Sequence, residues 1–556
     1  MAINSYLDTI NVQGPDITAL ADAVGFPASE FSKRIEYYTK MENWFNGTNL
    51  EETVGTGTDE QELYPAQYNP YPEMVQKHCA MLFGHYEIDE QPIVRQSVKP
   101  PNTDKKFKDL AQTVEEVLNT FYYENNVNAL LMDNATISQI YGGCVFKLSL
   151  YPDVKNDPLR TIGLTLSIVH PKYFVAIPSG SSFWNLREAW VVRPISLIEA
   201  KEIYFYTVGP DEEDDSDQLI WLVEHFTATK IVTTVGGKPA YKRVRGKKIP
   251  LDQKNPFGFV PLVYIPHERN GKFYGESMIS GTEGLIKEIN LRLGDYGDAV
   301  NTDSHNTFFI SGQGNFTVDE PDDLGTNIRV VSIKNHDVGM AKEPNANVSQ
   351  AKQSAHASMG ELIDNLLQLL YKRMHLPPVA YGVDEGSQRS AETLVARMWP
   401  LVAHAQMERI YWTVGLNRLA LMAIAMLRTK EDTNGEGEKL GLTEDTKKLK
   451  YTQKWQDFLP KDRQTLIDEL VSRFGANMTS LDKVQELLGD VEDPEEEKKL
   501  IYKGLKMMAE IQASSMPKPA PGQPAKSGST VGKTSTKTQA TKKPQDLKPM
   551  KEKTNE

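Results

Sequence analysis

The first half of the chain changes from helical to extended patterns of apolar residues. Apolar residues at spacings of three and four predict helices, and short β-branched or aromatic runs predict strands. Helices are predicted over 17–45, with a break near Pro27, and over 73–84, 105–123 and 127–141. Strands are predicted over 144–150, 163–170, 173–177, 189–194, 218–227 and 230–235. Helices followed by strands, without βαβ alternation, predict a mainly helical α+β fold.

A long helix with a single apolar stripe is predicted over 275–305. Its stripe consists of residues spaced three or four apart, namely Leu285, Ile289, Leu293, Tyr296 and Val300. At 1.5 Å per residue such a helix would reach about 46 Å, longer than most compact domains need. Strands at 308–311 and 328–333 form a β-rich insert between this helix and a second one over 348–374. The pattern predicts two struts that carry a small lobe.

A loop and a third long helix follow the second strut. Pro377 and Pro378 end the preceding helix, because a proline forces the residue before it out of the helical region. The next helix is predicted over 390–428, with a kink at Pro400. Three further helices are predicted over 460–474, 480–488 and 493–512. The core face of the first of these is predicted to consist of Leu466, Ile467, Leu470 and Val471.

Length and charge restrict the class of protein. A chain of 556 residues with 39% hydrophobic and 9% aromatic residues can bury more than one core. The formal net charge of −13 opposes tight binding to nucleic acid, because phosphate neutralisation supplies most of that affinity. From Met516 the tail holds nine Lys against three acidic residues and few apolar ones, so it is predicted to be disordered and basic.

Cysteine usage and hydropathy predict a compartment. Two cysteines, Cys79 and Cys144, cannot form a disulfide framework, which indicates a reducing environment. The N-terminus shows no signal-peptide pattern. The most apolar stretch, 410–427, carries Asn417 and Arg418 at its centre, so we expect a helix buried by protein and no membrane span.

The sequence contains no convincing catalytic, cofactor-binding or metal-binding pattern. Residues 528–534 resemble a phosphate-binding P-loop, but the glycine spacing is one residue short and no strand precedes them. His78 and His85 share a helical face two turns apart, too far to share a metal ion. Residues 267–269, His-Glu-Arg, suggest acid–base chemistry by composition only, because neighbours on an extended segment point in opposite directions. We therefore interpret the chain as non-enzymatic, with no cofactor and no metal.

Two charged runs have no assigned role. Residues 211–217 are almost entirely acidic, and residues 238–248 are strongly basic. Blocks of like charge usually mark solvated loops, and contact between the two runs in neighbouring protomers is the alternative.

Several strings of residues occur in a recognisable order. Residues 34–47 form a helix with an aromatic-x-Gly turn at its end, and residues 255–264 form a proline-flanked extended run before the long helix. Residues 454–462, Ser480-Leu481 and 493–497 then follow in the helical C-terminal part. Together these strings resemble the portal proteins, or head-to-tail connectors, of tailed bacteriophages, over about residues 31–512.

The resemblance implies a division of the chain into the parts of a portal protein. It assigns 1–264 to the wing, 265–305 to the first stem helix, 306–347 to the clip, 348–375 to the second stem helix and 376–389 to the tunnel loop. It assigns 390–439 to a long kinked wing helix and a link, 440–515 to the crown and 516–556 to a disordered tail. The tunnel loop that would touch passing DNA consists of Leu376, Pro377, Pro378, Val379, Ala380, Tyr381, Gly382, Val383, Asp384, Glu385, Gly386, Ser387 and Gln388.

The resemblance also implies a function. Portal proteins form a ring of about twelve copies at one capsid vertex. The channel lets double-stranded DNA pass during packaging and ejection, without sequence specificity. Implied partners are the terminase packaging motor, the head-completion or tail adaptor proteins, and the major capsid and scaffold proteins. The implied location is the virion, after assembly in the host cytoplasm. A helical scaffold or adaptor without a channel is the alternative, and an enzyme of unrecognised type comes third.

Overall fold

The computed structural model divides the chain into two units, 1–460 and 461–556, which are described separately. The structure describes residues 28–51, 67–84, 94–150, 161–180, 182–208, 218–244, 247–304, 307–312, 329–334, 347–350, 356–381, 391–434, 441–456, 458, 463–481, 484–485 and 494–515. Helices and mostly antiparallel sheets lie in separate stretches of the first unit, in agreement with the predicted α+β class.

The first unit begins with helices that the sequence pattern largely predicted. They are α2 (Ala28–Asn46), α3 (Thr48–Glu51), α4 (Tyr71–Phe83), α5 (Lys105–Glu124) and α6 (Val127–Tyr141). Asp104 caps α5, since its side chain accepts a hydrogen bond from the Lys106 amide, and α4 ends at Gly84 with a positive φ of 77°. The part of the first predicted helix before residue 28 lies outside the described residues.

Two sheets follow the helices. The sheet β12-β2-β3 consists of β2 (Gly143–Leu150), β3 (Leu164–Val169) and β12 (Leu262–Pro266). After η3 (Pro171–Tyr173), the six-stranded sheet is built from β4 (Phe174–Ser179), β5 (Ser182–Ser196), β6 (Leu219–Thr227), β7 (Lys230–Val235), β8 (Lys238–Pro239) and β11 (Asp252–Lys254). Helix α7 (Leu197–Tyr204) lies between β5 and β6 in the chain. All six predicted strands are present. Strand β2 contacts α6 and α10, and β12 contacts α10.

The basic run at 238–248 forms strands where a solvated loop was predicted. Strands β9 (Tyr241–Val244) and β10 (Lys247–Pro250) pair as an antiparallel hairpin next to β8. Lys248 lies 4.3 Å from the ring centre of Tyr241, so an aromatic face supports the cation. The acidic run at 211–217 lies outside the described residues.

The pairing of β1 (Val94–Lys99) with β16 (Lys450–Trp455) was not predicted. The strands are antiparallel, with Val94 opposite Trp455 and Lys99 opposite Lys450. The η5 turn (Glu444–Lys448) leads into β16, and Lys106 forms an ion pair of 2.8 Å with Asp445. Residues 441–456 therefore belong to the first unit, which ends at Pro460.

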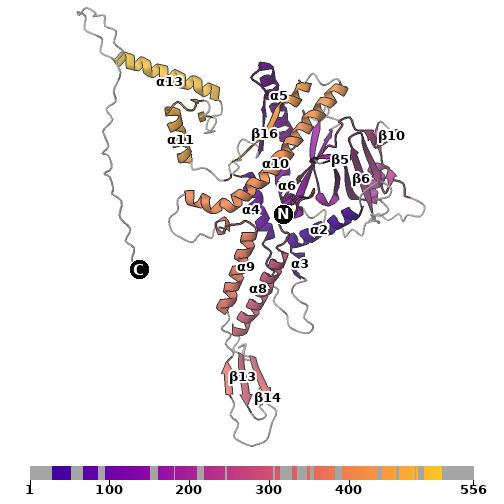
Figure 1. Cartoon of the computed structure of the whole chain (residues 1–556), viewed down its shortest axis with the longest axis vertical. Helices are drawn as coiled ribbons and strands as arrows, with labels where there is room; N and C mark the ends of the chain where they lie inside the picture. The colour runs from indigo at the N-terminus through magenta and orange to yellow at the C-terminus, as the bar shows by residue number, and fades with distance from the viewer. Residues whose placement is uncertain are drawn as a thin grey trace, which may run out of the picture. The chain divides into compact units, whose positions relative to one another are not determined.

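Helices α8 (Glu283–Ser304) and α9 (His356–Arg373) pack along each other as the two predicted struts (Figure 1). They carry a three-stranded sheet of order β14-β13-β15, made of β13 (Thr307–Gly312), β14 (Arg329–Lys334) and β15 (Asn347–Gln350). Strand β15 occupies the predicted start of the second helix at 348, and α9 begins at His356; residues 351–355 lie outside the described residues. Ile286 and Ile289 of α8 and Leu370 and Met374 of the second strut belong to one buried cluster.

The first strut begins at Glu283, later than the predicted 275. Residues 275–282 cannot be helical, because their backbone amides bond elsewhere. Glu276 N donates to Glu268 O at 2.7 Å, and Met278 N donates to Gln139 O at 2.9 Å. Gly275 passes so close to Gly142 that a side chain at either position would collide with the other backbone.

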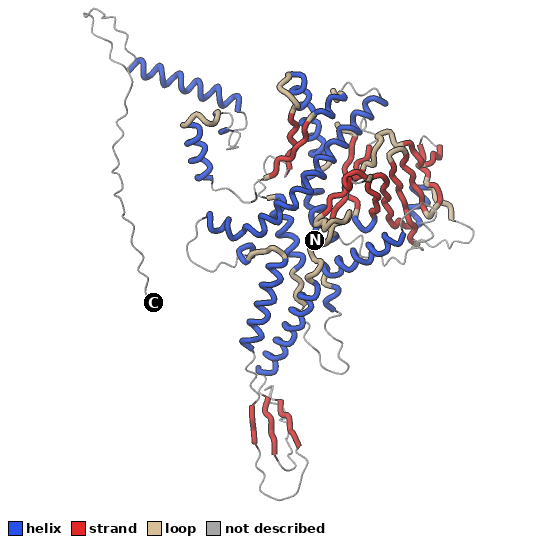
Figure 2. The backbone as a smooth tube through the Cα atoms, viewed as in Figure 1, coloured by secondary structure: helices blue, strands red, loops and turns tan. Residues whose placement is uncertain are grey.

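Helix α10 (Ala391–Asn434) runs through the core of the first unit. It changes direction along its length, and it contains Pro400 as predicted (Figure 2). Its segment Ala396–Thr429 is the one described stretch that is long and apolar enough to cross a membrane, but 56% of its most apolar window is buried in the protein. Asn417 accepts from Gln453 Nε2 at 3.2 Å, and Arg418 donates to Asn185 Oδ1. The pattern is that of a buried core helix.

The second unit contains α11 (Arg463–Gly475) and α13 (Pro494–Ser515), near the predicted positions. Most of the predicted helix over 480–488 lies outside the described residues. Leu470 is buried as predicted, but the side chain of Val471 is 63% exposed, so the predicted core face of α11 was too wide. The tail from Met516 lies outside the described residues.

The contact between α10 and β12 generates a stability prediction at Gly415. A Cβ atom at this position would lie 2.5 Å from the fully buried side chain of Ile265. Overpacking of a core costs about 1–3 kcal/mol, more than the roughly 1 kcal/mol that alanine gains over glycine in a helix. We expect Gly415→Ala to lower the thermal midpoint of the first unit, measured by scanning calorimetry.

Gly297→Ala is the matched control, because a Cβ atom at Gly297 in α8 meets open space. This variant should match or slightly exceed the wild-type midpoint, by up to about 1 kcal/mol of helix propensity. Equal midpoints for the two variants would show that α10 does not approach β12 as closely as described.

Candidate functional site

The candidate site is the junction where α9 ends and the predicted tunnel loop begins. Helix α9 ends at Arg373, and His375 takes the left-handed conformation with a φ of 53°. Leu376 N then donates to Tyr371 O at 2.9 Å, and η4 (Pro378–Tyr381) follows. The helix therefore ends just before Pro377, close to the predicted position.

Helix α4 anchors this junction with two neighbouring side chains. Lys77 Nζ donates to Ala380 O at 2.9 Å and lies 4.6 Å from the ring centre of Tyr381. The next residue, His78, uses Nε2 to bond the carbonyl oxygen of Met374 at 2.7 Å. Each of these interactions joins residues about 300 positions apart in the sequence, and none was predicted.

The described part of the predicted tunnel loop packs against the protein. Leu376 is 2% exposed, and the ring centres of Tyr371 and Tyr381 are 4.8 Å apart. The residues from Gly382 to Gln388, which include Asp384 and Glu385, lie outside the described residues. Leu376–Tyr381 thus forms a fixed base for whatever the rest of the loop does.

A cavity of about 650 Å³ opens beside this junction. Helix α9, η4 and the first turns of α10 line it, with Gln368, Lys372, His375, Pro378, Arg397 and Pro400 among its walls. Lys372 and Arg397 give the walls a positive character. The cavity reaches His375, whose ring stacks on the ring of His404 with centres 4.9 Å apart.

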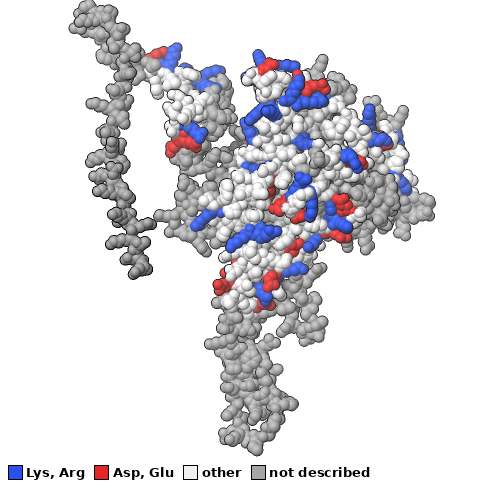
Figure 3. Space-filling model, in the orientation of Figure 1, with Lys and Arg blue, Asp and Glu red and all other residues white. Residues whose placement is uncertain are grey.

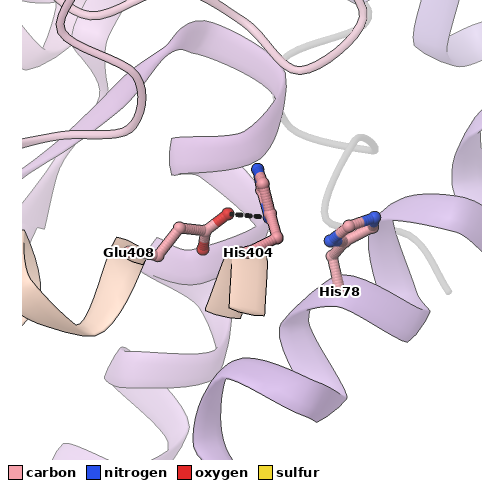
Figure 4. A group of neighbouring side chains, drawn as sticks. All are labelled: His78, His404 and Glu408. Carbon is pink, nitrogen blue, oxygen red and sulfur yellow. Dashed lines mark ion pairs between the residues drawn. The ribbon is translucent and has the colours of Figure 1, made fainter. Parts of the chain in front are cut away.

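Behind His375 lies a buried cluster of histidines around one carboxylate. Glu408 and His404 are four residues apart on α10 and therefore share a face of that helix. His78 rises towards them from α4 (Figure 4). His267 reaches the same carboxylate from the turn after β12, and His78, His267, His404 and Glu408 are each less than 9% exposed.

Hydrogen bonds hold the Glu408 carboxylate in place. Oε1 accepts from His267 Nε2 at 2.9 Å, and Gln139 Nε2 contacts Oε1 at 3.0 Å and Oε2 at 2.9 Å. The other ring nitrogen of His267 lies 3.1 Å from the carbonyl oxygen of Glu276. Since a carbonyl and a carboxylate both require N–H donors, His267 is protonated at both nitrogens.

The pKa values follow from burial and from this pairing. Burial alone would raise the pKa of Glu408, but the charge and hydrogen bond of His267 lower it to about 2. Burial alone would lower the pKa of His267, but the charge and hydrogen bond of Glu408 raise it above the ordinary value. Burial lowers the pKa of His78 to about 3, so this ring is neutral. The cluster holds a buried ion pair beside a neutral histidine.

His404 lies between two carboxylates. Its Nε2 atom is 3.3 Å from Glu268 Oε1, and its Nδ1 atom is 3.2 Å from Glu408 Oε1. The hydrogen bond with His404 lowers the pKa of Glu268, whose side chain is 48% exposed. Glu268 therefore connects the buried cluster with solvent.

The structure brings together residues that local patterns do not connect. His267 and Glu268 point in different directions, as neighbours on an extended segment do, yet His267 contacts Glu408 and Glu268 contacts His404. The sequence pairs His78 only with His85, which lies outside the described residues, whereas the structure pairs His78 with α10. The spacing of His404 and Glu408 was the one local signal, since residues four apart on a helix meet.

The predicted stem stripe is used mainly inside the protomer. Ile289 is fully buried in a cluster that also contains residues of α9 and α4. Leu285 and Leu293 are partly buried and pack against this cluster. Tyr296 is half-buried and Val300 is 44% exposed, so the stripe leaves the core towards the insert. The stripe therefore packs on α9 first, and only its end is open to another molecule.

Charge is mixed on the face of the described residues that Figure 3 shows. Acidic and basic side chains alternate over the face shown in Figure 3, without a field of one sign. On α8, for example, Arg292 bonds both Glu288 and Asp295, at 2.8 and 3.0 Å. The P-loop-like residues 528–534 lie outside the described residues.

Comparison with known proteins identifies one family. The family model described as phage portal protein, SPP1 Gp6-like, matches residues 98–510. This match covers the sheet β12-β2-β3, the six-stranded sheet, both struts with their insert, α10, α11 and most of α13. A comparison with curated proteins gives no match.

The buried ion pair generates a prediction for Glu408. Removing one partner of a buried pair costs about 3–5 kcal/mol, because the other charge stays buried. We expect Glu408→Ala to lower the free energy of unfolding by that order, measured by chemical denaturation.

The pH dependence follows from the pKa shifts. The lowered pKa of Glu408 gives stability that is complete above its ordinary pKa of 4.5 and is lost as pH falls towards 2. The raised pKa of His267 gives stability that is complete below its ordinary pKa of 6.5 and is lost as pH rises through the folded value. The effect of Glu408→Ala should therefore be largest between pH 4.5 and 6.5.

Glu73→Ala, which removes an exposed partner of Lys77, is the control and should cost at most about 1 kcal/mol. Equal losses in the two variants would contradict a buried pair at Glu408.

Proposed function

Since the chain belongs to the phage portal proteins of the SPP1 Gp6-like type, we propose that about twelve copies close into a ring around a channel for double-stranded DNA. As a portal protein, the chain is a structural component of the phage capsid. The proposal adds the closed ring, the passage of DNA during packaging and ejection, and the docking of motor and tail proteins.

An exposed apolar face of α10 supports lateral contact between copies. Its members, all at least 38% exposed, are Trp399, Met407, Ile410, Val414 and Leu421. At 3.6 residues per turn these positions fall within about a quarter of a turn of one another. An exposed apolar face of this kind indicates a protein–protein contact, and a ring supplies one for every copy.

The struts and insert support a docking role at one end of the ring. Helices α8 and α9 hold β13, β14 and β15 away from the rest of the first unit (Figure 1). The insert sheet is complete within itself, because β13 pairs with both other strands. We assign the insert to the terminase motor during packaging and to the head-completion or tail adaptor proteins afterwards.

The loop from Leu376 to Gln388 is assigned to the channel wall. Its base is fixed by Lys77 and His78, as a loop that meets moving DNA requires. Asp384 and Glu385 would place negative charge near the DNA phosphates and so keep the contact weak. The loop would then guide DNA without gripping it.

The ring predicts a specific assembly result. Negative-stain class averages and native mass spectrometry of the purified chain should show closed rings of about twelve copies. Ile410→Glu should reduce the yield of rings, because it places charge in the exposed face of α10. Ile198→Glu is the matched control, since Ile198 on α7 is also exposed (51%) but lies outside that face.

Only monomers and dimers at every concentration and salt would contradict the ring and favour the scaffold or adaptor alternative. Equal ring yields for Ile410→Glu and Ile198→Glu would exclude this face of α10 as the interface. A reconstruction of the ring also locates 376–388, and density for this loop away from the channel axis would remove it from the DNA path.

The insert predicts a second, separable result. Because β15 extends to Gln350, a short Gly/Ser link should replace 306–350. The struts pack on each other and on α4, so this variant should still form rings. It should lose binding to the packaging motor, measured by pull-down with purified terminase. Motor binding that survives the replacement would move the docking site elsewhere.

A further inference from the structure

The buried cluster contains a ring nitrogen that hydrogen bonding does not explain. His404 Nδ1 is buried and has no hydrogen-bond partner among the described residues. It lies 3.2 Å from Glu408 Oε1, but the two atoms are not aligned for a hydrogen bond. Two such atoms at this separation have the spacing of neighbouring ligands around one cation.

The surrounding contacts direct the same nitrogen inward. His404 Nε2 lies 3.3 Å from Glu268 Oε1, where an N–H group donates to the carboxylate. This contact leaves Nδ1 as the nitrogen with a lone pair. Ligating histidines in metal sites usually donate their other N–H to a carboxylate or a backbone carbonyl in this way.

His78 has the same arrangement on the opposite side. Its Nε2 contacts the carbonyl oxygen of Met374 at 2.7 Å, so this nitrogen carries the hydrogen and Nδ1 carries the lone pair. The rings of His78 and His404 are 5.1 Å apart between centres. One ligand atom from each of His78, His404 and Glu408 can be chosen so that all three lie within 4.8 Å of one another.

We propose that His78, His404 and Glu408 bind a divalent transition-metal ion, with zinc as the best fit. Two imidazoles and one carboxylate are a ligand set that zinc uses, and its bonds of about 2.0–2.2 Å place ligand atoms roughly 3.3 Å apart. The pair of His404 Nδ1 and Glu408 Oε1 already has that spacing, and metal binding would draw the His78 ligand atom in from its present position, within 4.8 Å of the other two. Water or a neighbouring side chain takes the fourth position.

The neighbouring groups suit this role. Gln139 and His267 hold the Glu408 carboxylate and fix its orientation: Oε1 accepts from both side chains, whereas Oε2 accepts from Gln139 and keeps an acceptor site for a cation. Glu268, 48% exposed, and His375, at the wall of the cavity, provide a path from solvent to the cluster. Bound zinc would join α4 to α10 directly behind the base of the predicted tunnel loop. The site does not depend on ring formation or on DNA.

The test uses untagged full-length protein that has been treated with chelator and then titrated with Zn²⁺ or Co²⁺. Wild type should bind one ion per chain, raise its thermal midpoint and give the visible absorption of tetrahedral Co²⁺. His78→Gln and His404→Gln place an amide where Nε2–H stood and remove the Nδ1 ligand. Each should weaken binding by more than about 100-fold, beyond the 10–100-fold typical of supporting residues.

The variants separate a ligand from a structural residue. With chelator present, each variant should melt close to wild type, and only added metal should separate them. His225→Gln is the matched control, because His225 lies on β6, away from the proposed ligands on α4 and α10. This variant should bind metal as wild type does. If a variant fails to fold, X-ray absorption of the zinc-loaded wild type still tests the ligands and should show two histidines. No bound ion in wild type, wild-type affinity in both cluster variants, or a zinc shell without histidine would overturn the proposal.

Discussion

The interior of the first unit depends on the need to satisfy one buried carboxylate. Glu408 is 4% exposed, and an unpaired charge at that depth would cost several kcal/mol. Its partners come from α6, from the turn after β12 and from α10 itself, while His78 brings α4 to the same place. None of these elements can move far without uncovering a charge. The cluster therefore fixes α4, α6 and α10 relative to one another and, through the bond of His78 to Met374, relative to the end of the second strut.

Local patterns were enough to predict most helices and the strands of the two larger sheets. Helix α6 lies where spacing and Gly142 predicted it, because its apolar face and its glycine stop are encoded within a few residues. The predicted start of the first strut at residue 275 was wrong, because Gly275 approaches Gly142 closely. This is a tertiary contact that no local pattern encodes. Strands β1 and β16 were not predicted, because each is short and mixes polar with apolar residues. Each forms a strand only by pairing with the other.

The candidate site shows the same limit more sharply. The end of α9 at the prolines could be predicted, because proline acts on its own neighbours. The anchors Lys77 and His78 could not, since nothing local links α4 to a loop about 300 residues away. The stem stripe was read correctly as apolar, but periodicity gives the face of a helix and not its partner. Here the partner of Ile289 is largely the second strut and α4, within one protomer.

The β1–β16 ladder has a consequence for the order in which the chain can fold. Ser97 and Thr452, which bond across it, are 355 residues apart. Both struts, the insert and α10 are contained in the loop that this ladder closes. A ribosome releases the chain from its N-terminus, so β1 waits unpaired until nearly the whole first unit has emerged. Closing so long a loop is slow, and the ladder forms late. A truncated chain that ends before β16 leaves the β1 edge open, so the surface around β1 is finished only when the chain is complete through Trp455.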